Sequence, residues 1–129
     1  MDKKIGAQLY TVRDFCRSRE DFKESVRRVK EIGYSHVQMS GVGPFGDEDV
    51  LDCGDFIRKT CDEYGIKITC THRPYESVVN NLDAEIAYHK AMGCNVMGIG
   101  GISEKEFETK EALMDTIKKL NEVSDIVSK

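Results

Sequence analysis

The chain has 129 residues, of which 40% are hydrophobic and 33% are charged, and its net charge at pH 7 is −4. This length and composition predict one globular domain over residues 1–129, and the acidic balance leaves no basic footprint for a nucleic acid. No apolar run approaches the roughly 20 residues of a membrane span, and Met1 to Lys4 lack the apolar core of a signal peptide, so we expect a cytoplasmic protein with no membrane partner.

A short sequence pattern that recurs along the chain predicts its architecture. A helix end, a glycine and a short apolar strand follow one another at Gly33, Gly65 and Gly93, about 30 residues apart, and one more strand opens the chain. A strand–helix repeat of this length is typical of βαβ units and a parallel sheet. The next glycine would fall near Lys129, so we expect four units of a fold that should be longer.

Four strands are expected in chain order. They cover Ile5 to Val12, Tyr34 to Ser40, Ile66 to Thr71 and Cys94 to Ile99. Polar residues alternate in the first three: Gln8, then His36 and Gln38, then Lys67, Thr69 and Thr71. Strands covered by helices on both faces should be almost continuously apolar, whereas alternating polar side chains suit a barrel interior near its mouth. The predicted fold is α/β, with four βα units and a parallel sheet that form half of a TIM (β/α)8 barrel.

Four helices are expected, each with an apolar stripe. Their expected ranges are about Asp21 to Ile32, Asp47 or Asp49 to Tyr64, Asn80 or Asn81 to Met92, and about Thr109 to Val127. Gly33 and Gly65 follow the first two helices as C-caps, and an asparagine is expected to cap the third. No linker rich in glycine and proline divides the chain, which also favours a single domain.

The five cysteines, Cys16, Cys53, Cys61, Cys70 and Cys94, are odd in number and include no C-x-x-C pair. Four of them fall in expected strands or helices. We therefore interpret them as buried reduced thiols of a cytosolic protein. A zinc site would need clustered ligands, and the sequence shows none.

Candidate functional residues are selected by their place in the strands, because ligands of parallel α/β proteins bind at the C-terminal strand ends. That rule selects Gln8, Tyr10, Gln38, Ser40, His72, Arg73 and the stretch Gly98 to Gly101. Gln8 and Gln38 can orient a hydroxyl-rich ligand, since a carboxamide both donates and accepts, or they can hydrogen-bond one another. Tyr10 is either a stacking wall for a ligand or plain packing.

His72 is the strongest single candidate for a functional residue. It follows a predicted strand and lies two residues before a proline that stiffens the turn. A histidine there can shuttle a proton, hydrogen-bond a substrate or bind a metal, or it can simply bond a backbone carbonyl. The glycine-rich stretch around Gly100 would let the backbone approach a ligand closely. His36, near the expected barrel floor, and His89, on the inward stripe of a helix, are interpreted as structural.

Several segments of the sequence resemble those of the sugar phosphate isomerase/epimerase family, the xylose isomerase-like TIM barrels. They are Gly6-Ala-Gln-Leu-Tyr-Thr-Val-Arg-Asp14, Gly33 to Gln38, His72-Arg-Pro-Tyr-Glu76 and His89 to Gly100. The third is similar to a His-x-Pro-x-Glu motif of the family, and the resemblance covers the whole chain. Many relatives have glutamate where this chain has Gln38, so the resemblance assigns no carboxylate role to that position.

The resemblance implies a metal-dependent parent enzyme. Relatives bind a divalent metal (Mn, Mg, Zn or Co) through Glu, Asp, His and Glu from the later strands, and two glutamates act as acid and base while the metal polarises the substrate oxygens. This chain would be the N-terminal half, inactive or nearly so by itself, with no metal ligand and no catalytic residue. It would contribute the wall that binds a sugar or sugar phosphate: Gln8, Tyr10, Gln38, His72 and Gly100.

Two alternatives belong to other classes. One is a standalone, non-catalytic half-barrel binding module that self-associates as a homodimer or swapped assembly, because an open half-barrel leaves strand edges and a lumen face bare. The other is an apurinic endonuclease-type metalloenzyme on the same fold. The acidic balance and the absence of a histidine at the end of the second strand argue against it.

Overall fold

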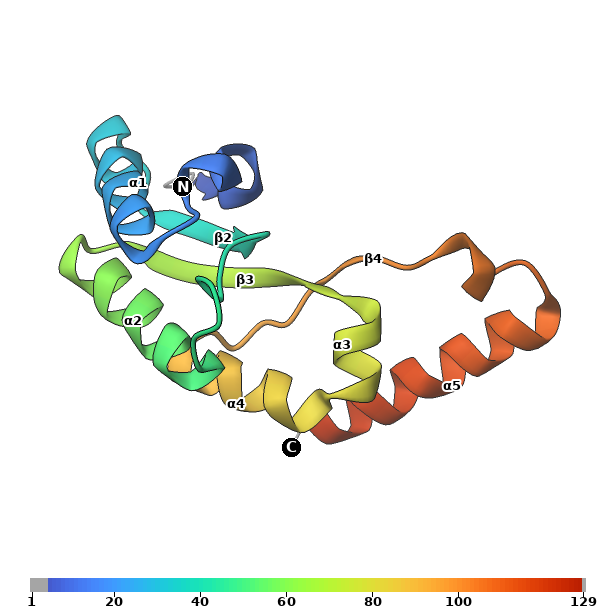
Figure 1. Cartoon of the computed structure of the whole chain (residues 1–129). Helices are drawn as coiled ribbons and strands as arrows, with labels where there is room; N and C mark the ends of the chain where they lie inside the picture. Colours follow the sequence, from blue (N-terminus) through green and yellow to red (C-terminus); the bar gives the residue numbers. More distant parts are fainter. Residues whose placement is uncertain (1–4, 129) are drawn as a thin grey trace.

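The computed structural model describes residues 5–128, which form one four-stranded sheet flanked by helices (Figure 1). Met1 to Lys4, on which the signal-peptide argument rests, and Lys129 lie outside the described residues. The elements in chain order are β1 (Gly6–Gln8), the 3-10 helix η1 (Leu9–Phe15), α1 (Arg19–Ile32), β2 (His36–Ser40), α2 (Val50–Glu63), β3 (Lys67–Pro74), α3 (Tyr75–Asn80), α4 (Leu82–Met92), β4 (Ile99–Gly101), the 3-10 helix η2 (Glu104–Glu106) and α5 (Lys110–Val127).

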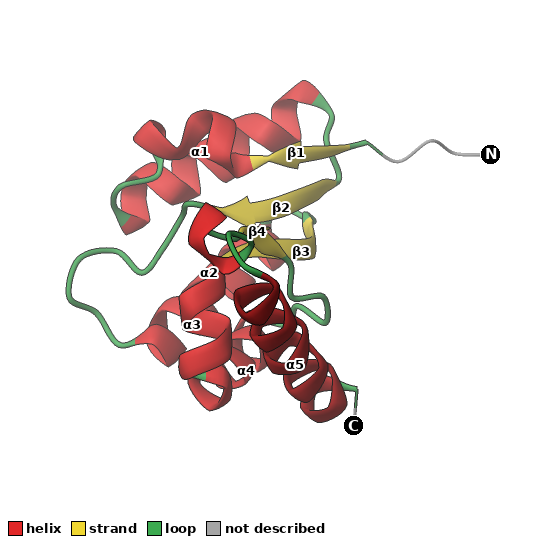
Figure 2. Ribbon diagram, turned by 90° about the vertical axis from the view of Figure 1, so that its right-hand side faces the viewer, coloured by secondary structure: helices red, strands yellow, loops and turns green. Residues whose placement is uncertain are grey.

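The strands lie in the order β1-β2-β3-β4, and every neighbouring pair is parallel. The prediction of an α/β fold with a parallel sheet and interleaved helices is therefore confirmed. The register places Gln8 beside Gln38 and Ser40 beside His72. Figure 2 shows the sheet with α1 beside β1, and with α3, α4 and α5 grouped at the other end. No helix among residues 5–128 combines the length and apolar character needed to cross a membrane.

The core lies between the sheet and α1, α2 and α4. Leu9, Phe22, Val37 and Ile57 are fully buried in one cluster. The ring of Phe22 packs against that of Phe45, which lies in the loop before α2. The two ring centroids are 5.6 Å apart. Burying a large apolar side chain stabilises the fold by about 1.5–3 kcal/mol, so these few residues fix α1 and α2 against the strands.

Helix ends follow the local sequence closely at four places. Gly33 and Gly93 adopt left-handed conformations that end α1 and α4. The Asp49 side chain accepts hydrogen bonds from two backbone N–H groups at the start of α2, and Thr109 caps α5 in the same way. Asn81 occupies the N-cap position of α4 as predicted, but its side chain makes no capping hydrogen bond.

Several element boundaries differ from prediction. The first strand ends at Gln8 instead of Val12, because this edge strand has a partner on one side and the chain turns into η1 to bury Leu9. The third strand continues to Pro74, and an unexpected helix, α3, follows it. α3 forms because it buries Tyr75 and Val78 against the fold.

The last strand also differs: β4 covers Ile99–Gly101, later than the predicted Cys94 to Ile99. The preceding segment still runs along β3, because the Thr71 N–H donates to the Val96 carbonyl and the Gly98 N–H donates to the Thr71 carbonyl. A Cβ on Gly98 would lie 2.4 Å from the Thr71 carbonyl oxygen, so only glycine permits this approach.

All five cysteines lie in the described region and are free thiols. Four are buried as predicted, whereas Cys70 is half-buried because its side chain faces the open side of β3. Burial raises the pKa of the Cys61 thiol to about 12, and burial together with a hydrogen bond to Glu48 raises that of Cys53 to about 12. Both thiols therefore stay protonated and behave as small apolar core groups.

Candidate functional site

Three of the predicted site residues form one hydrogen-bonded chain across the strands. The Gln8 Nε2 group donates to Gln38 Oε1 at 2.7 Å, and Gln38 Nε2 lies 3.2 Å from His72 Nε2 and 3.2 Å from the Cys70 sulfur. The parallel register brings them together, because residues two apart in a strand share a face and Gln8 pairs with Gln38. Of the two possibilities that the sequence left open for the glutamine pair, the structure shows the mutual hydrogen bond, and the orientation of a ligand stays a prediction.

The hydrogen-bonding role of each His72 ring nitrogen follows from this contact. The Gln38 amide nitrogen only donates, so His72 Nε2 is the acceptor. In the tautomer that fits this contact, Nδ1 carries the proton. His72 thus presents a donor on one side while its other nitrogen is held by the glutamine chain.

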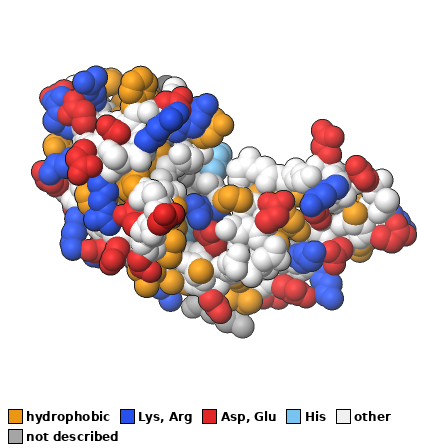
Figure 3. Space-filling view, viewed as in Figure 1, with side chains coloured by type: hydrophobic (Ala, Val, Ile, Leu, Met, Phe, Trp, Pro, Cys, Tyr) orange, Lys and Arg blue, Asp and Glu red, His pale blue; other side chains and the backbone are white. Residues whose placement is uncertain are grey.

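A cavity of about 540 Å³ opens at the C-terminal ends of the strands, beside this chain. Gln8, Tyr10, His72 and Gly100 line it, whereas Gln38 is not a lining residue and contacts Gln8 and His72 beside the cavity. Further lining residues are Ser40, Gly41, Val42, Gly43, Arg73, Pro74 and Gly101. In Figure 3 a histidine side chain (pale blue) lies where the upper surface is hollowed.

The loop after β2 is the part of this site that sequence reasoning missed. Gly41, Val42 and Gly43 line the cavity, although none of them was among the residues selected from the predicted strand ends. Their position directly after a strand that ends in a selected residue, Ser40, was the signal that could have identified them. The site therefore has a backbone-rich rim on two sides, formed by this loop and by the Gly100 turn.

The backbone of Gly100 packs against the side chain of His72. A Cβ at this position would lie 3.2 Å from the Cβ of His72, closer than most real contacts. The absence of a side chain therefore keeps the His72 ring at the cavity wall and leaves room above it.

Tyr10 reaches the cavity from η1 and not from a strand end, which corrects its predicted place. Its side chain is 48% exposed, and the Arg13 guanidinium lies 4.0 Å from the ring centroid. Arg13 Nη1 also donates to the Tyr10 carbonyl at 2.8 Å. This cation–π contact occupies one face of the ring, so the ring is held in place at the rim.

A layer of buried polar groups supports the end of β3 from behind. His89 Nδ1 donates to the Glu85 carbonyl at 2.7 Å, so His89 Nε2 accepts from the Thr71 hydroxyl at 2.8 Å. Burial lowers the pKa of His89, which keeps its ring neutral. Both ring nitrogens are bonded inside the core, so the prediction that His89 is structural is confirmed.

Arg73 completes this layer by binding Glu85 with two hydrogen bonds, of 2.7 and 2.8 Å. Burial alone would raise the pKa of Glu85, but these bonds and the Arg73 charge outweigh it and hold that pKa below its usual value. The Arg73 guanidinium also lies 5.2 Å from the Tyr88 ring centroid. Because Arg73 follows His72 directly, the pair fixes the strand end that carries the histidine.

The residues described here do not fit the divalent metal that the resemblance implies. Within residues 5–128, no three His, Cys, Asp or Glu side chains come together as a group that could hold a metal ion. His72 has the Gln38 amide beside it, and the Glu85 carboxylate is bound by Arg73. We therefore derive no step through a metal on this chain.

No protein-family model matches this chain, and no curated protein sequence matches it significantly. Its fold is similar to the crystal structure of a sugar phosphate isomerase/epimerase from Parabacteroides distasonis, with a TM-score of 0.60 and 16% sequence identity. The match covers 98% of this chain and 49% of that one, so the chain spans about half the length of the solved structure. The fold is thus half of a TIM-barrel-like fold, as predicted from the sequence.

Proposed function

We propose that this chain is the substrate-binding wall of a metal-dependent sugar or sugar-phosphate isomerase or epimerase, corresponding to its N-terminal half as one domain over residues 1–129. The observation that carries the proposal is the hydrogen-bonded chain of Gln8, Gln38 and His72, in which Gln8 and His72 line the strand-end cavity and Gln38 links them. Tyr10 and Gly100 complete the wall.

The chemistry of the wall suits a polyhydroxylated ligand. Each carboxamide offers donors and an acceptor, and the His72 ring offers a donor at Nδ1. A sugar hydroxyl also both donates and accepts, so it can replace one link of the glutamine chain without leaving a group unpaired. The wall binds and orients the sugar carbons, while a second half-barrel would supply the divalent metal (Mn, Mg, Zn or Co) and the acid and base.

The proposal is tested by nuclear magnetic resonance titration of the 129-residue chain with D-fructose and with D-fructose 6-phosphate. We expect saturable shifts of the Gln8 and Gln38 side-chain amides and of the His72 ring, with a dissociation constant on the order of 1 mM or weaker. Gln38→Ala and His72→Ala should each weaken binding at least severalfold.

His36→Ala is the matched control, since His36 lies on the same strand and face as Gln38 but at the other end of β2. Its Nδ1 contacts the Ser35 hydroxyl at 2.7 Å, away from the cavity. If His36→Ala and His72→Ala change the titration equally, or if neither sugar gives saturable shifts, the wall proposal is wrong.

A second candidate, a standalone binding module that self-associates as a homodimer or swapped assembly, is favoured by a different observation. Large apolar side chains are exposed at both ends of the sheet, among them Phe15 and Ile32 near β1 and Met114 and Ile117 on α5. Exposed apolar patches of this kind mark interaction surfaces. Self-association and sugar binding are separable properties, and each has its own test.

A further inference from the structure

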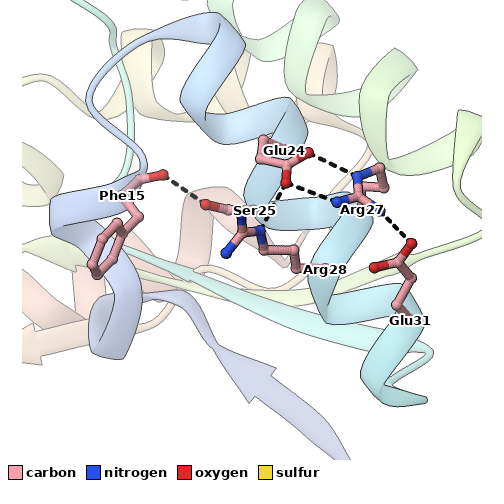
Figure 4. Close-up of polar contacts among 6 residues, drawn as sticks. All are labelled: Phe15, Glu24, Ser25, Arg27, Arg28 and Glu31. Carbon is pink, nitrogen blue, oxygen red and sulfur yellow. Dashed lines mark hydrogen bonds and ion pairs between the residues drawn. The ribbon is translucent and has the colours of Figure 1, made fainter.

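A groove runs between α1 and η1, away from the strand-end cavity. It encloses about 530 Å³, and its apolar lining comes from Val12, Phe15, Val29 and Ile32. Phe15 is 71% exposed and Ile32 is 74% exposed, which is unusual for such large apolar side chains. Figure 4 shows how the floor is fixed: the Ser25 hydroxyl on α1 donates to the Phe15 carbonyl on η1 at 2.6 Å.

The groove lies on the flank of α1 that faces the free edge of the sheet. The opposite flank meets α2, since Phe22 packs 6.1 Å from Phe56 and Lys23 pairs with Glu63 at 3.0 Å. The groove residues Ser25 and Ile32 are seven positions apart, two helical turns, and lie on the other side. Within the described residues β1 pairs with β2 alone, so the groove and the unpaired edge of β1 form one continuous open flank.

The other end of the sheet carries a helix with an apolar stripe and little to cover it. Thr116 is the only residue of α5 that is fully buried, and all of α5 is described. Met114 is 55% exposed and Ile117 is 43% exposed. Lys110, Met114 and Ile117 follow a four-then-three spacing, which places them on one face. Figure 1 shows α5 at the far side of the molecule from α1.

We propose that a second copy of this chain seats its α5 in the α1–η1 groove of the first, and that the first copy does the same to the second. The inference rests on the self-association proposed above. The two copies are related by a two-fold axis that coincides with the barrel axis. The β4 edge of each copy then lies beside the β1 edge of the other, and the two four-stranded halves close one eight-stranded parallel barrel.

Closure of the barrel selects a second copy as the occupant of the groove. Both surfaces belong to one chain, and a contact between two unlike surfaces must either close or continue indefinitely. Closure with two copies covers both edges at once. The Parabacteroides distasonis structure has about twice the length of this half-barrel, so a barrel of that size needs a second half.

Neighbouring helices of such a barrel run parallel, so the beginning of α5 lies beside the beginning of α1.

Sedimentation equilibrium on the 129-residue chain tests the inference with three exposed-site variants. We expect wild type to sediment as two copies, and Ile32→Glu in the groove and Ile117→Glu on α5 each to raise the dissociation constant about tenfold or more, because each interface occurs twice and buries the new charge. Leu51→Glu is the matched control, since Leu51 is 45% exposed on α2 and belongs to neither surface. Circular dichroism verifies that each variant is folded.

An equimolar mixture of the Ile32→Glu and Ile117→Glu variants gives the sharper result. A mixed pair retains one intact groove-to-helix interface, so the mixture should associate more strongly than either variant alone. If it does not, the two surfaces do not bind each other and the inference is overturned. Wild-type dimers that tolerate both variants also overturn it while leaving self-association standing. A wild-type monomer at high micromolar concentration overturns self-association, and the sugar-binding proposal is then judged by its own titration.

Discussion

At one end of the sheet, α1 and α2 bury Phe22, Val26 and Ile57 completely against β1 to β3, while at the other end α5 buries one residue, Thr116, of its 18. Both regions carry the apolar periodicity of a core-facing helix. In the first region a neighbouring helix and the sheet cover the stripe, whereas in the second the stripe faces an open flank. An amphipathic pattern therefore says that a helix has a partner, but not that the partner is in the same half-barrel.

The largest contrast between the two regions should come from truncating an apolar side chain in each. We expect Phe22→Ala to lower the free energy of unfolding by about 3–5 kcal/mol, because it opens a cavity among Phe45 and Phe56. Leu113→Ala on α5, where the side chain is 38% exposed, should cost less than about 1 kcal/mol at submicromolar protein. Urea denaturation measures both.

The same pair also bears on assembly. If α5 is buried by a second copy, the cost of Leu113→Ala should grow with protein concentration, while that of Phe22→Ala should not. Equal costs for the two substitutions at low concentration would mean that α5 is packed as well as α1, and the contrast between the regions would be lost.

A smaller effect is expected from breaking the buried ion pair in the packed region. Glu85→Ala leaves the Arg73 guanidinium without its two hydrogen bonds, and we expect a loss of about 3 kcal/mol in urea denaturation. Asp55→Ala is the control, since Asp55 pairs with Arg58 and Lys59 on the surface of α2, outside the proposed interface. It should change stability far less, because solvent screens exposed pairs. Equal losses would show that the Arg73 pair is not specifically buried.

The smallest expected effect is a pH dependence from His89. Its folded pKa lies below the ordinary value of 6.5, because burial disfavours the charged ring. The unfolded chain therefore binds the proton first, and stability falls as the pH drops below about 6.5. Urea denaturation at pH 7.5 and 5.5 should show this drop in wild type, and His89→Gln should reduce it. A His36→Gln variant should keep the drop, and an unchanged slope in His89→Gln would assign it to other groups.

Local sequence determined the repeating architecture of this protein. The strand alternation placed Gln8 and Gln38 on one face, and parallel pairing then brings them within hydrogen-bond distance. The glycines at Gly33 and Gly93 ended their helices as predicted, because a left-handed cap depends on one residue and its immediate neighbours. The strand alternation and the helix caps require no contact from distant parts of the chain, which is why sequence alone determines them, and the Gln8–Gln38 bond follows once β1 and β2 pair.

Tertiary structure decided what depends on a partner. β1 stops at Gln8, and Tyr10 enters a 3-10 helix, because an edge strand is held from one side and burial of Leu9 favours the turn. The pairing of Arg73 with Glu85 joins two elements whose separation no spacing rule predicts. The exposure of α5 is the strongest case: its sequence specifies an apolar stripe, but burial is a property of the surfaces that meet it, and only the three-dimensional arrangement shows that within residues 5–128 those surfaces leave most of the stripe open.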